Sequence, residues 1–457
     1  MLLLHHYGLK FYDRVTGHHI LDRLDELTHT QWLSPEELQA LQRRRLRSLL
    51  AYAYMYVPYY QRVFDEVGFR ADALESDPES FWKIPPVSKA TMREHPEEFI
   101  TTEAARREGI SPSATSGSTG EPFVFWEDHH FQDYANANTF RHHTWCGWQP
   151  GQLRVYLWGI PFGVTFKRRV WDQVRDLTWG RTFVNAFNLS DETMSRLAAL
   201  IRRRRPKLLH GYVSALHLFA RFVRENGCND VKVPAVYTSA EVLYPHQREY
   251  IEETFDCEVF NRYATHEVGG IACECEKHTG MHISTETNYV EILHEDNVPV
   301  KDGEAGNVVV TSLTYYVFPF IRYRFEDIGC MSTRPCPCGR GQPMLGAIEG
   351  RHNDMFKTRD GRTVLWGIDR PFKTMQGVRK FQFVQKSLDY VVVRVVKDGP
   401  MSQAQRAEVE QTLKIALGDH VKIDFEFPDE IPVGRSGKYR YTICEIADEG
   451  GHDAQQP

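Results

Sequence analysis

From about residue 110 onward, short runs of β-branched and aromatic residues alternate with segments whose apolar residues recur at helical spacing. The runs LRVYLWG, VPAVYTS and VVVTSL, at 153–159, 233–239 and 308–313, predict strands. The segments SDETMSRLAALIRRRR and YPHQREYIEETF, at 190–205 and 244–255, predict helices. Because alternating strands and helices bury their apolar faces in layers, this pattern predicts an α/β fold with mixed sheets.

The pattern changes at both ends of this region. Before it, Ser34 and Glu37 predict a capping box, with Pro35 at the first helical position. After about residue 355, strands around FQFVQ and YVVVRVV are followed by a helix at 401–418 and a last strand, VKIDFEF, which predicts a smaller α+β unit. We therefore expect a large layered N-terminal domain and a small C-terminal domain. The expected bounds are 1–354, with a helical start over about 1–100 and a core over about 101–354, then 355–448 and a flexible tail at 449–457.

Composition narrows the class of ligand. Of 457 residues, 42% are hydrophobic and 25% are charged, which is typical of a folded globular protein. With 55 basic and 61 acidic residues, the chain has no general field that would attract nucleic acid or anionic lipid, so a small-molecule substrate is favoured. The N-terminus has a three-residue apolar run, too short for a signal or a membrane span, which predicts a cytoplasmic protein. The oligomeric state stays open, a homodimer being one option.

The segment SPSATSGSTGEP, at 111–122, is the most informative in the chain. Its hydroxyls and unobstructed backbone N–H groups can surround a polyphosphate. It is not a Walker loop, because Glu121 and Pro122 stand where Lys and Ser or Thr would follow. Alone, such a run is more often a linker. The residues that would bind phosphate are Thr115, Ser116, Gly117, Ser118, Thr119 and Gly120.

Further segments follow this loop in a fixed order. They are TSAEVL at 238–243, NRYATHEVGG at 261–270, YRFEDIG at 323–329, IEGRHNDM at 348–355 and GRSGKYRY at 434–441. Together with the loop they resemble the adenylate-forming enzyme superfamily, and within it the phenylacetate-CoA ligase family with its relatives of capsular polysaccharide biosynthesis. The resemblance covers most of the chain, and it implies an adenylation domain followed by a small, mobile C-terminal domain.

The resemblance also implies a role for each segment. The loop would bind the phosphates of ATP. TSAEVL, with Glu241, would contact adenine and has Ala240 where glycine is usual. Tyr263 would stack on adenine, and Glu267 would hold magnesium.

Three later segments complete the implied nucleotide site. Asp327 would hold the ribose hydroxyls, and Arg351 would contact the nucleotide. Asp354 would be the interdomain hinge, and Lys438 would be the catalytic lysine.

These residue types fit the chemistry of adenylation. A carboxylate that attacks the α-phosphorus meets a highly charged triphosphate, so magnesium at Glu267 and the charge of Lys438 would stabilise the leaving pyrophosphate. Because Lys438 would then block the face that the acyl acceptor needs, we expect the small domain to rotate about Asp354. The predicted activity is ATP- and magnesium-dependent formation of an acyl-adenylate from a small carboxylic acid, followed by transfer to coenzyme A.

Two departures from the family pattern leave alternatives open. Glu121 replaces the commoner basic residue of the phosphate loop. FKTRDGRTVLWG, at 356–367, does not match the Arg-Gly-x-x-x-x-Pro stretch that borders the acceptor path. An amine or hydroxyl acceptor in place of coenzyme A is thus an alternative. A non-catalytic, zinc-containing interaction protein is a third hypothesis, against which the retention of Glu267, Asp327 and Lys438 argues.

Cysteines cluster in the second half of the chain. Six of nine fall between Cys257 and Cys338, which indicates metal binding rather than a disulfide framework. The ligand types and the long loop between the two pairs predict a structural zinc site that pins the loop after Glu267 to the loop after Asp327. The predicted ligands are Cys275, His282, Cys336 and Cys338, with Cys273, His278 and Cys330 as substitutes for one member. Buried thiols without metal are the alternative.

Aromatic residues between the phosphate loop and the adenine segment form the predicted acid pocket. An aromatic or otherwise planar acid fits such a lining, although aromatics make up 12% of the chain and most fill the core. The predicted pocket residues are Tyr134, Trp158, Phe162 and Tyr212.

Overall fold

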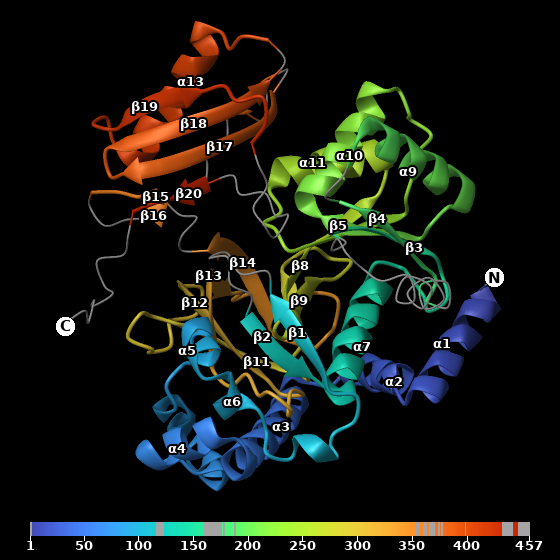
Figure 1. Cartoon of the computed structure of the whole chain (residues 1–457), viewed down its shortest axis with the longest axis vertical. Coiled ribbons are helices and arrows are strands. Elements are labelled where there is room, and N and C mark those ends of the chain that lie inside the picture. The colour runs from blue at the N-terminus through green and yellow to red at the C-terminus, as the bar shows by residue number, and fades with distance from the viewer. Residues whose placement is uncertain are drawn as a thin grey trace. The chain divides into compact units, whose positions relative to one another are not determined.

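The computed structural model divides into two compact units, Met1–Ile348 and Glu349–Pro457. It describes residues 2–115, 123–159, 176, 179–186, 189–351, 356–359, 363–364, 371–372, 375, 378–397, 399–431 and 442–446. In the large unit, coloured blue to yellow in Figure 1, helices precede three sheets.

The N-terminal region is helical. Ser34 caps its longest helix, since its side chain accepts from the backbone of Glu37 while the Glu37 side chain accepts from the Ser34 backbone, as predicted. The next helix begins at Pro58, whose missing N–H ends one helix and suits the first turn of another. The α-helices are α1 (Leu2–Thr16), α2 (Ile20–Thr30), α3 (Pro35–Tyr56), α4 (Pro58–Glu66), α5 (Lys89–Glu94) and α6 (Pro96–Phe99). Short 3-10 turns span Ala71–Glu75, Pro78–Lys83 and Ala104–Arg106.

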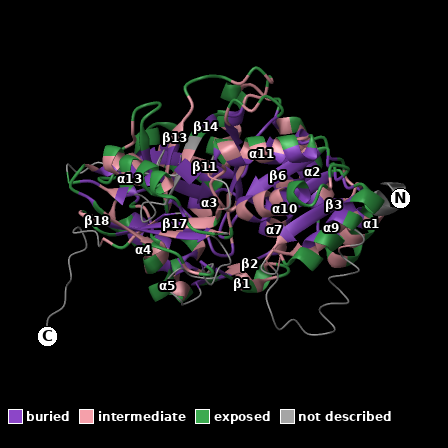
Figure 2. Cartoon of the chain, turned by 90° about the horizontal axis from the view of Figure 1, so that it is seen from above, coloured by how far each residue is buried: buried purple, intermediate pink, exposed green. Residues whose placement is uncertain are grey.

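A parallel five-stranded sheet in the order β4-β3-β5-β6-β7 confirms the predicted alternation of strands and helices. Helices α9, α10 and α11 cover one face and α7 covers the other (Figure 1). The strands are β3 (Arg154–Trp158), β4 (Arg181–Asn185), β5 (Leu208–Tyr212), β6 (Ala235–Ser239) and β7 (Glu258–Phe260). The helices are α7 (His129–Trp145), α9 (Asp191–Arg204), α10 (Val213–Glu225) and α11 (Pro245–Phe255). In Figure 2, β3 and β6 are buried whereas α9 exposes part of its surface.

The other large sheet has seven strands in the order β11-β12-β13-β14-β10-β9-β8. Its pairings β8–β9, β9–β10, β10–β14, β11–β12 and β12–β13 are antiparallel. The strands are β8 (Arg262–Thr265), β9 (Gly269–Glu274), β10 (Met281–Ile283), β11 (Asn288–Leu293), β12 (Ala305–Ser312), β13 (Tyr323–Met331) and β14 (Met344–Arg351). A separate hairpin pairs β1 (Ser111–Thr115) with β2 (Phe123–Glu127).

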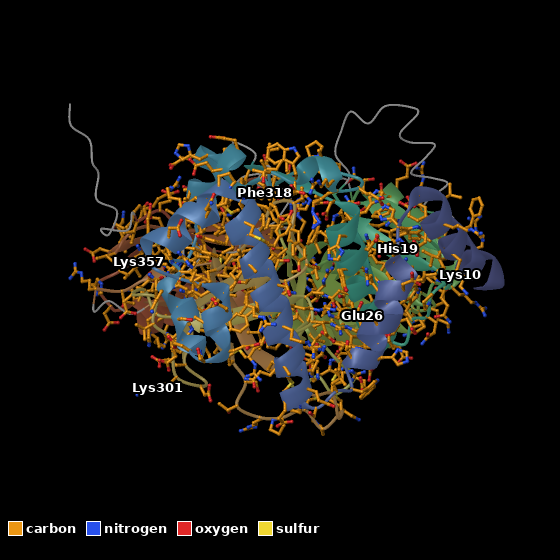
Figure 3. The ribbon with its side chains drawn as sticks, turned by 90° about the horizontal axis from the view of Figure 1, so that it is seen from below. Lys10, His19, Glu26, Lys301, Phe318 and Lys357 are labelled. Carbon is orange, nitrogen blue, oxygen red and sulfur yellow. The ribbon has the colours of Figure 1, made fainter. Side chains whose placement is uncertain are left out.

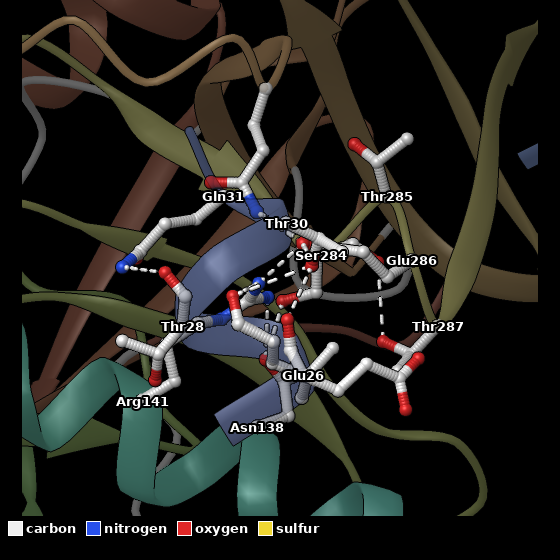
Figure 4. A network of polar contacts seen from close by, with 12 residues as sticks. Glu26, Thr28, Thr30, Gln31, Asn138, Arg141, Ser284, Thr285, Glu286 and Thr287 are labelled. Atoms are coloured by element: carbon white, nitrogen blue, oxygen red, sulfur yellow. Dashed lines mark hydrogen bonds and ion pairs between the residues drawn. The ribbon is translucent and has the colours of Figure 1, made fainter. Parts of the chain in front are cut away.

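Buried polar contacts join the N-terminal helices to the sheets. Arg141 on α7 donates to Glu286 (2.6 Å) and to Asn138 (2.9 Å), and Thr30 on α2 donates to the same Glu286 carboxylate (2.9 Å). Figure 4 shows these side chains converging between the helices and the β10–β11 connection. Since both members of the Arg141–Glu286 pair are fully buried, loss of either one would leave an uncompensated charge.

The small unit is an α+β structure, as the sequence predicted. Its four-stranded sheet has the order β19-β18-β17-β20, in which β17 and β18 are antiparallel and the outer strands are parallel to their neighbours. The bounds are β17 (Val378–Ser387), β18 (Tyr390–Lys397), α13 (Gln403–Leu417), β19 (Lys422–Glu426) and β20 (Thr442–Cys444). A two-stranded hairpin joins β15 (Phe356–Lys357) to β16 (Thr363–Val364).

In the part of the chain that the structure describes, no helix has the length and apolar character needed to cross a membrane.

Candidate functional site

Lys89, the first residue of α5, connects two predicted nucleotide ligands. Its Nζ donates to Thr115 Oγ1 (2.7 Å), at the end of β1, and lies 3.4 Å from Glu267 Oε1, in the β8–β9 turn. Thr115 and Glu267 are both buried, with 9% and 8% of their surface exposed. The start of the phosphate loop and the predicted magnesium ligand therefore share one cation, Lys89, which belongs to none of the sequence motifs.

Tyr263 and Asp327 also meet. The Tyr263 hydroxyl donates to Asp327 Oδ2 (2.7 Å), although β8 and β13 are separated by three strands in the sheet order. The seven-stranded sheet must therefore curl until its edge strand faces β13, as twisted sheets do. Two side chains predicted to contact adenine and ribose lie side by side.

Glu241, predicted to lie in the adenine segment, holds the start of α10. Its carboxylate accepts from the backbone N–H of Ser214 (2.6 Å) and from the Ser214 hydroxyl (2.9 Å). A carboxylate at a helix N-terminus satisfies unpaired backbone N–H groups. The preceding residue, Ala240, has φ +70°, in the left-handed region that explains why glycine is usual there.

Several predicted residues lie outside the described part of the structure. The phosphate-loop members are Ser116, Gly117, Ser118, Thr119 and Gly120, and the others are Phe162, Asp354 and Lys438. Arg351 is the last residue of β14, but its side chain also lies outside the described part of the structure.

Trp158 and Tyr212, predicted for the acid pocket, lie at the carboxyl ends of β3 and β5. Their ring centroids are 4.5 Å apart. Ligands of open α/β sheets bind beyond the carboxyl ends of the strands, so this pair lies where the fold places a substrate.

Tyr134, the other described pocket residue, packs differently. Its hydroxyl donates to Glu26 Oε2 (2.9 Å), and the guanidinium groups of Arg23 and Arg45 lie 4.8 and 5.2 Å from its ring centroid. Figure 3 labels Glu26, which belongs to α2, and His19, which directly precedes that helix. The structure thus brings Trp158 and Tyr212 together and places Tyr134 in a contact between α7 and α2.

The four predicted metal ligands converge. The ligand atoms of Cys275, His282, Cys336 and Cys338 all lie within 4.8 Å of one another. Cys275 Sγ is 3.6 Å from Cys336 Sγ, and Cys338 Sγ is 3.3 Å from His282 Nε2. Tetrahedral zinc with Zn–S of about 2.3 Å would hold two sulfurs about 3.8 Å apart, so the donor set and its spacing fit this ion.

The residues around this Cys/His cluster set the orientation and the protonation of its ligands. His282 Nδ1 donates to the carbonyl of Gln342 (3.4 Å), which directs Nε2 toward the sulfurs. Burial lowers the pKa of His282 to about 4, so the ring is a neutral donor. Burial raises the pKa of the Cys275 thiol to about 12, so its thiolate form requires a compensating cation. Among the described residues, this Cys/His cluster does not include the suggested substitutes Cys273, His278 and Cys330.

Comparisons with known proteins agree with this architecture. Residues 356–445 match the family model described as the CapK C-terminal domain. The chain is 28% identical over 449 residues to phenylacetate-coenzyme A ligase of Thermus thermophilus, covering 90% of this chain and 97% of the relative. It is 24% identical over 375 residues to protein CapK of Staphylococcus aureus, covering 80% of each.

A solved structure shares the fold of both units. It is 2-hydroxyisobutyryl-CoA ligase in the postadenylation state in complex with R3-HIB-AMP, with a TM-score of 0.72, 23% identity and 90% of each chain covered. The α/β architecture, with a large N-terminal and a small C-terminal domain, is therefore that of the adenylate-forming ligases. Over most of its length the chain is thus similar to phenylacetate-coenzyme A ligase and to CapK, and residues 356–445 match the CapK C-terminal domain.

Proposed function

We propose that this protein is an adenylate-forming acid–CoA ligase that activates a small carboxylic acid with ATP and then transfers the acyl group to coenzyme A. The observation that carries the proposal is the meeting of Lys89, Thr115 and Glu267 beside the phosphate loop. The relatives named phenylacetate-coenzyme A ligase support the same activity.

In the first half-reaction, an oxygen of the acid carboxylate attacks the α-phosphorus of ATP. A carboxylate–phosphorus bond forms, the bond to the β-phosphate oxygen breaks, and pyrophosphate leaves. Lys89 and Lys438 stabilise the negative charge that moves onto the pyrophosphate. Magnesium held by Glu267 would supply further charge neutralisation at the phosphate oxygens.

Lys89 also accounts for the acidic residue at the end of the phosphate loop. Where relatives commonly place a basic residue, this chain has Glu121. Because the Lys89 ammonium already lies 2.7 Å from the Thr115 hydroxyl, a cation reaches the phosphate side from α5 instead.

Asp327 orients the nucleotide. Its carboxylate can accept hydrogen bonds from the ribose hydroxyls, while the hydroxyl of Tyr263 holds the carboxylate from the side (2.7 Å). Fixing the ribose fixes the position of the α-phosphorus relative to the acid, and such orientation contributes much of the rate.

In the second half-reaction, the thiol of coenzyme A attacks the acyl carbon, the bond to the phosphate oxygen breaks, and AMP leaves. We propose that Asp354 is the pivot about which the small unit turns between the two steps. The segment at 356–367, which does not match the family's stretch beside the acceptor path, permits transfer to an amine or hydroxyl acceptor, and this is the second candidate function.

The Cys/His cluster would bind a structural zinc ion. All four ligand positions are supplied by the protein, which is typical of structural sites, whereas catalytic sites keep one position open. The ion would tie the end of β9 to the β13–β14 connection, and so support the strands that carry Tyr263 and Asp327.

The variant Lys89→Met tests the proposal at the observation that carries it. We expect its acid-dependent pyrophosphate release to fall by about 100-fold, as when a preorganised donor to a developing negative charge is removed. Lys83→Met, which removes an exposed lysine from the same region, is the matched control and should keep wild-type turnover. Equal turnover in both variants would remove Lys89 from the mechanism.

A further inference from the structure

Arg262, the first residue of β8, is a partly buried cation without an acidic partner. Its NH2 donates to Thr139 Oγ1 on α7 (3.1 Å). Its Nε is buried and has no hydrogen-bond partner, and no carboxylate oxygen of the described residues lies within 4.0 Å of the guanidinium. Because a guanidinium group carries five N–H donors, the bond to Thr139 leaves donors that a ligand can use.

Two other interior arginines of this unit are paired with carboxylates. Arg141 pairs with Glu286 (2.6 Å) and Arg322 with Glu291 (3.0 Å), and both guanidinium groups are fully buried. Arg154 resembles Arg262 in having an unpaired Nε and no carboxylate partner among the described residues, but it has two hydrogen-bonded nitrogens and lies 4.2 and 4.6 Å from the centroids of two aromatic rings. Arg262 is only partly buried, and a ligand with an acceptor oxygen would give its buried Nε the partner that the described residues do not supply.

A second unpartnered polar side chain lies nearby on β5. His210 is 3% exposed, and neither of its ring nitrogens has a hydrogen-bond partner. It pairs in register with Tyr237 on β6, and the two ring centroids are 4.7 Å apart. The Arg262 guanidinium carbon lies 5.8 Å from the centroid of the same Tyr237 ring. Burial and the charge of Arg262 hold the pKa of His210 well below its usual range, so the ring is neutral and offers one donor and one acceptor.

Both side chains adjoin residues assigned above to substrate and nucleotide. The His210 ring centroid is 5.4 Å from that of Trp158, which in turn contacts Tyr212. Tyr263, which follows Arg262 in β8, bonds to Asp327. The Arg262 side chain therefore lies against Tyr237, and His210 lies between Tyr237 and the aromatic pair at the carboxyl ends of β3 and β5.

We propose that Arg262, assisted by His210, binds a second polar group of the acid substrate. The substrate class is then a small acid that carries a carboxylate or hydroxyl group in addition to the carboxylate that is activated. A carboxylate would neutralise the guanidinium group and accept two of its N–H donors, whereas a purely hydrocarbon acid would leave the cation uncompensated. This inference rests on the proposed function, because it assigns specificity to the same site.

The test compares acids that differ only in the second group. Phenylacetate is paired with 4-hydroxyphenylacetate and 4-carboxyphenylacetate, and butyrate with 4-hydroxybutyrate and succinate. Affinity is measured by calorimetry on the full-length protein without ATP, so that binding is read separately from turnover. In the wild type, at least one substituted acid should bind about 10- to 100-fold more tightly than its parent, as expected for a charge-assisted hydrogen bond.

Three variants complete the test. Arg262→Met should abolish the preference, and Arg262→Lys should keep part of it because the charge remains but the planar fork is lost. Arg196→Met removes an exposed arginine on α9 and should leave the preference unchanged. If Arg262→Met does not fold, a partial loss in Arg262→Lys supports the inference, and an unchanged preference there overturns it.

The outcomes separate this inference from the proposed function. A preference that depends on Arg262, in a protein that releases no pyrophosphate with any acid, supports the binding site and rejects the ligase activity. No wild-type preference in either series overturns the inference. An equal loss of affinity for every acid in Arg262→Met also overturns it, since the arginine would then hold the carboxylate that is activated.

Discussion

At the residue scale, the candidate site combines side chains that lie in recognisable sequence motifs with side chains that no motif could predict. Thr115 and Glu267 lie in recognisable motifs, so their residue types and their order in the chain predict their roles. Lys89 is a single lysine at the start of a six-residue helix, and no spacing connects it with the phosphate loop. Only the folded structure shows that Lys89 Nζ lies 2.7 Å from Thr115 Oγ1, at the end of β1. Arg262 was missed because one arginine in a strand gives no sign of lacking a partner.

Ala240 provides a stability test at this scale. Its φ of +70° is costly for an L-residue with a Cβ atom but not for glycine. We expect Ala240→Gly to increase the free energy of unfolding by about 1 kcal/mol. Ala235→Gly, in the regular part of β6, should instead decrease it, because strand glycine costs entropy and loses packing. Chemical denaturation of both variants measures the difference, and destabilisation by Ala240→Gly would contradict the backbone argument.

At the element scale, local pattern predicted most strands and helices. Strands predicted at 153–159, 233–239 and 308–313 are observed as β3, β6 and β12, because apolar runs of that length are buried in a sheet. The order of the seven-stranded sheet could not be predicted. β10 pairs with β14, which follows it by about 60 residues, and partner choice over such a separation depends on the whole packed core.

The contact between Asp13 on α1 and Leu21 on α2 should make the stability of the fold depend on pH. Asp13 accepts from the backbone of Leu21 (3.0 Å), but burial raises the pKa of Asp13 to about 6. A folded-state pKa above the unfolded value near 3.8 means that the folded protein binds more protons between pH 4 and 6. The stability due to this group is therefore present below about pH 4 and is lost as the pH rises through 6.

Asp13→Asn should remove this dependence. Its melting temperature should rise relative to the wild type between about pH 4 and 6, and the gain should stay constant above pH 6. Asp25→Asn, an exposed acid on α2, is the control and should show no such change. Parallel melting curves for Asp13→Asn and wild type at all pH values would show that Asp13 titrates as in the unfolded chain.

The Cys/His cluster provides a second test at the element scale. Because its ligands come from β9–β10 and from the β13–β14 connection, we expect about one zinc per chain and a melting temperature several degrees lower after chelation. Cys336→Ser should lose the metal. Cys228→Ser, which changes a cysteine outside the cluster, should keep it. Elemental analysis that finds no metal in the purified wild type would rule out the zinc assignment.

At the scale of the whole molecule, the division into two units has a chemical consequence. The described residues proposed to bind the nucleotide, Thr115, Glu267, Tyr263 and Asp327, belong to the large unit, whereas the proposed catalytic residue Lys438 belongs to the small one. Adenylation requires that they act on one substrate, so we propose that the small unit approaches the large one for the first step and turns about Asp354 for the second. The order of the motifs predicts roles for these residues, but it carries no information on a movement of the small unit.

The most direct test of the account is acid-dependent pyrophosphate release by the full-length protein, measured over a panel of carboxylic acids with and without coenzyme A. We expect release that requires acid, ATP and magnesium, with AMP as the co-product and an acyl thioester when coenzyme A is present. Lys438→Ala should abolish release while ATP still binds, because this lysine acts on charge that develops in the transition state. Release without any acid, or undiminished release by Lys438→Ala, would contradict adenylation as the function of this chain.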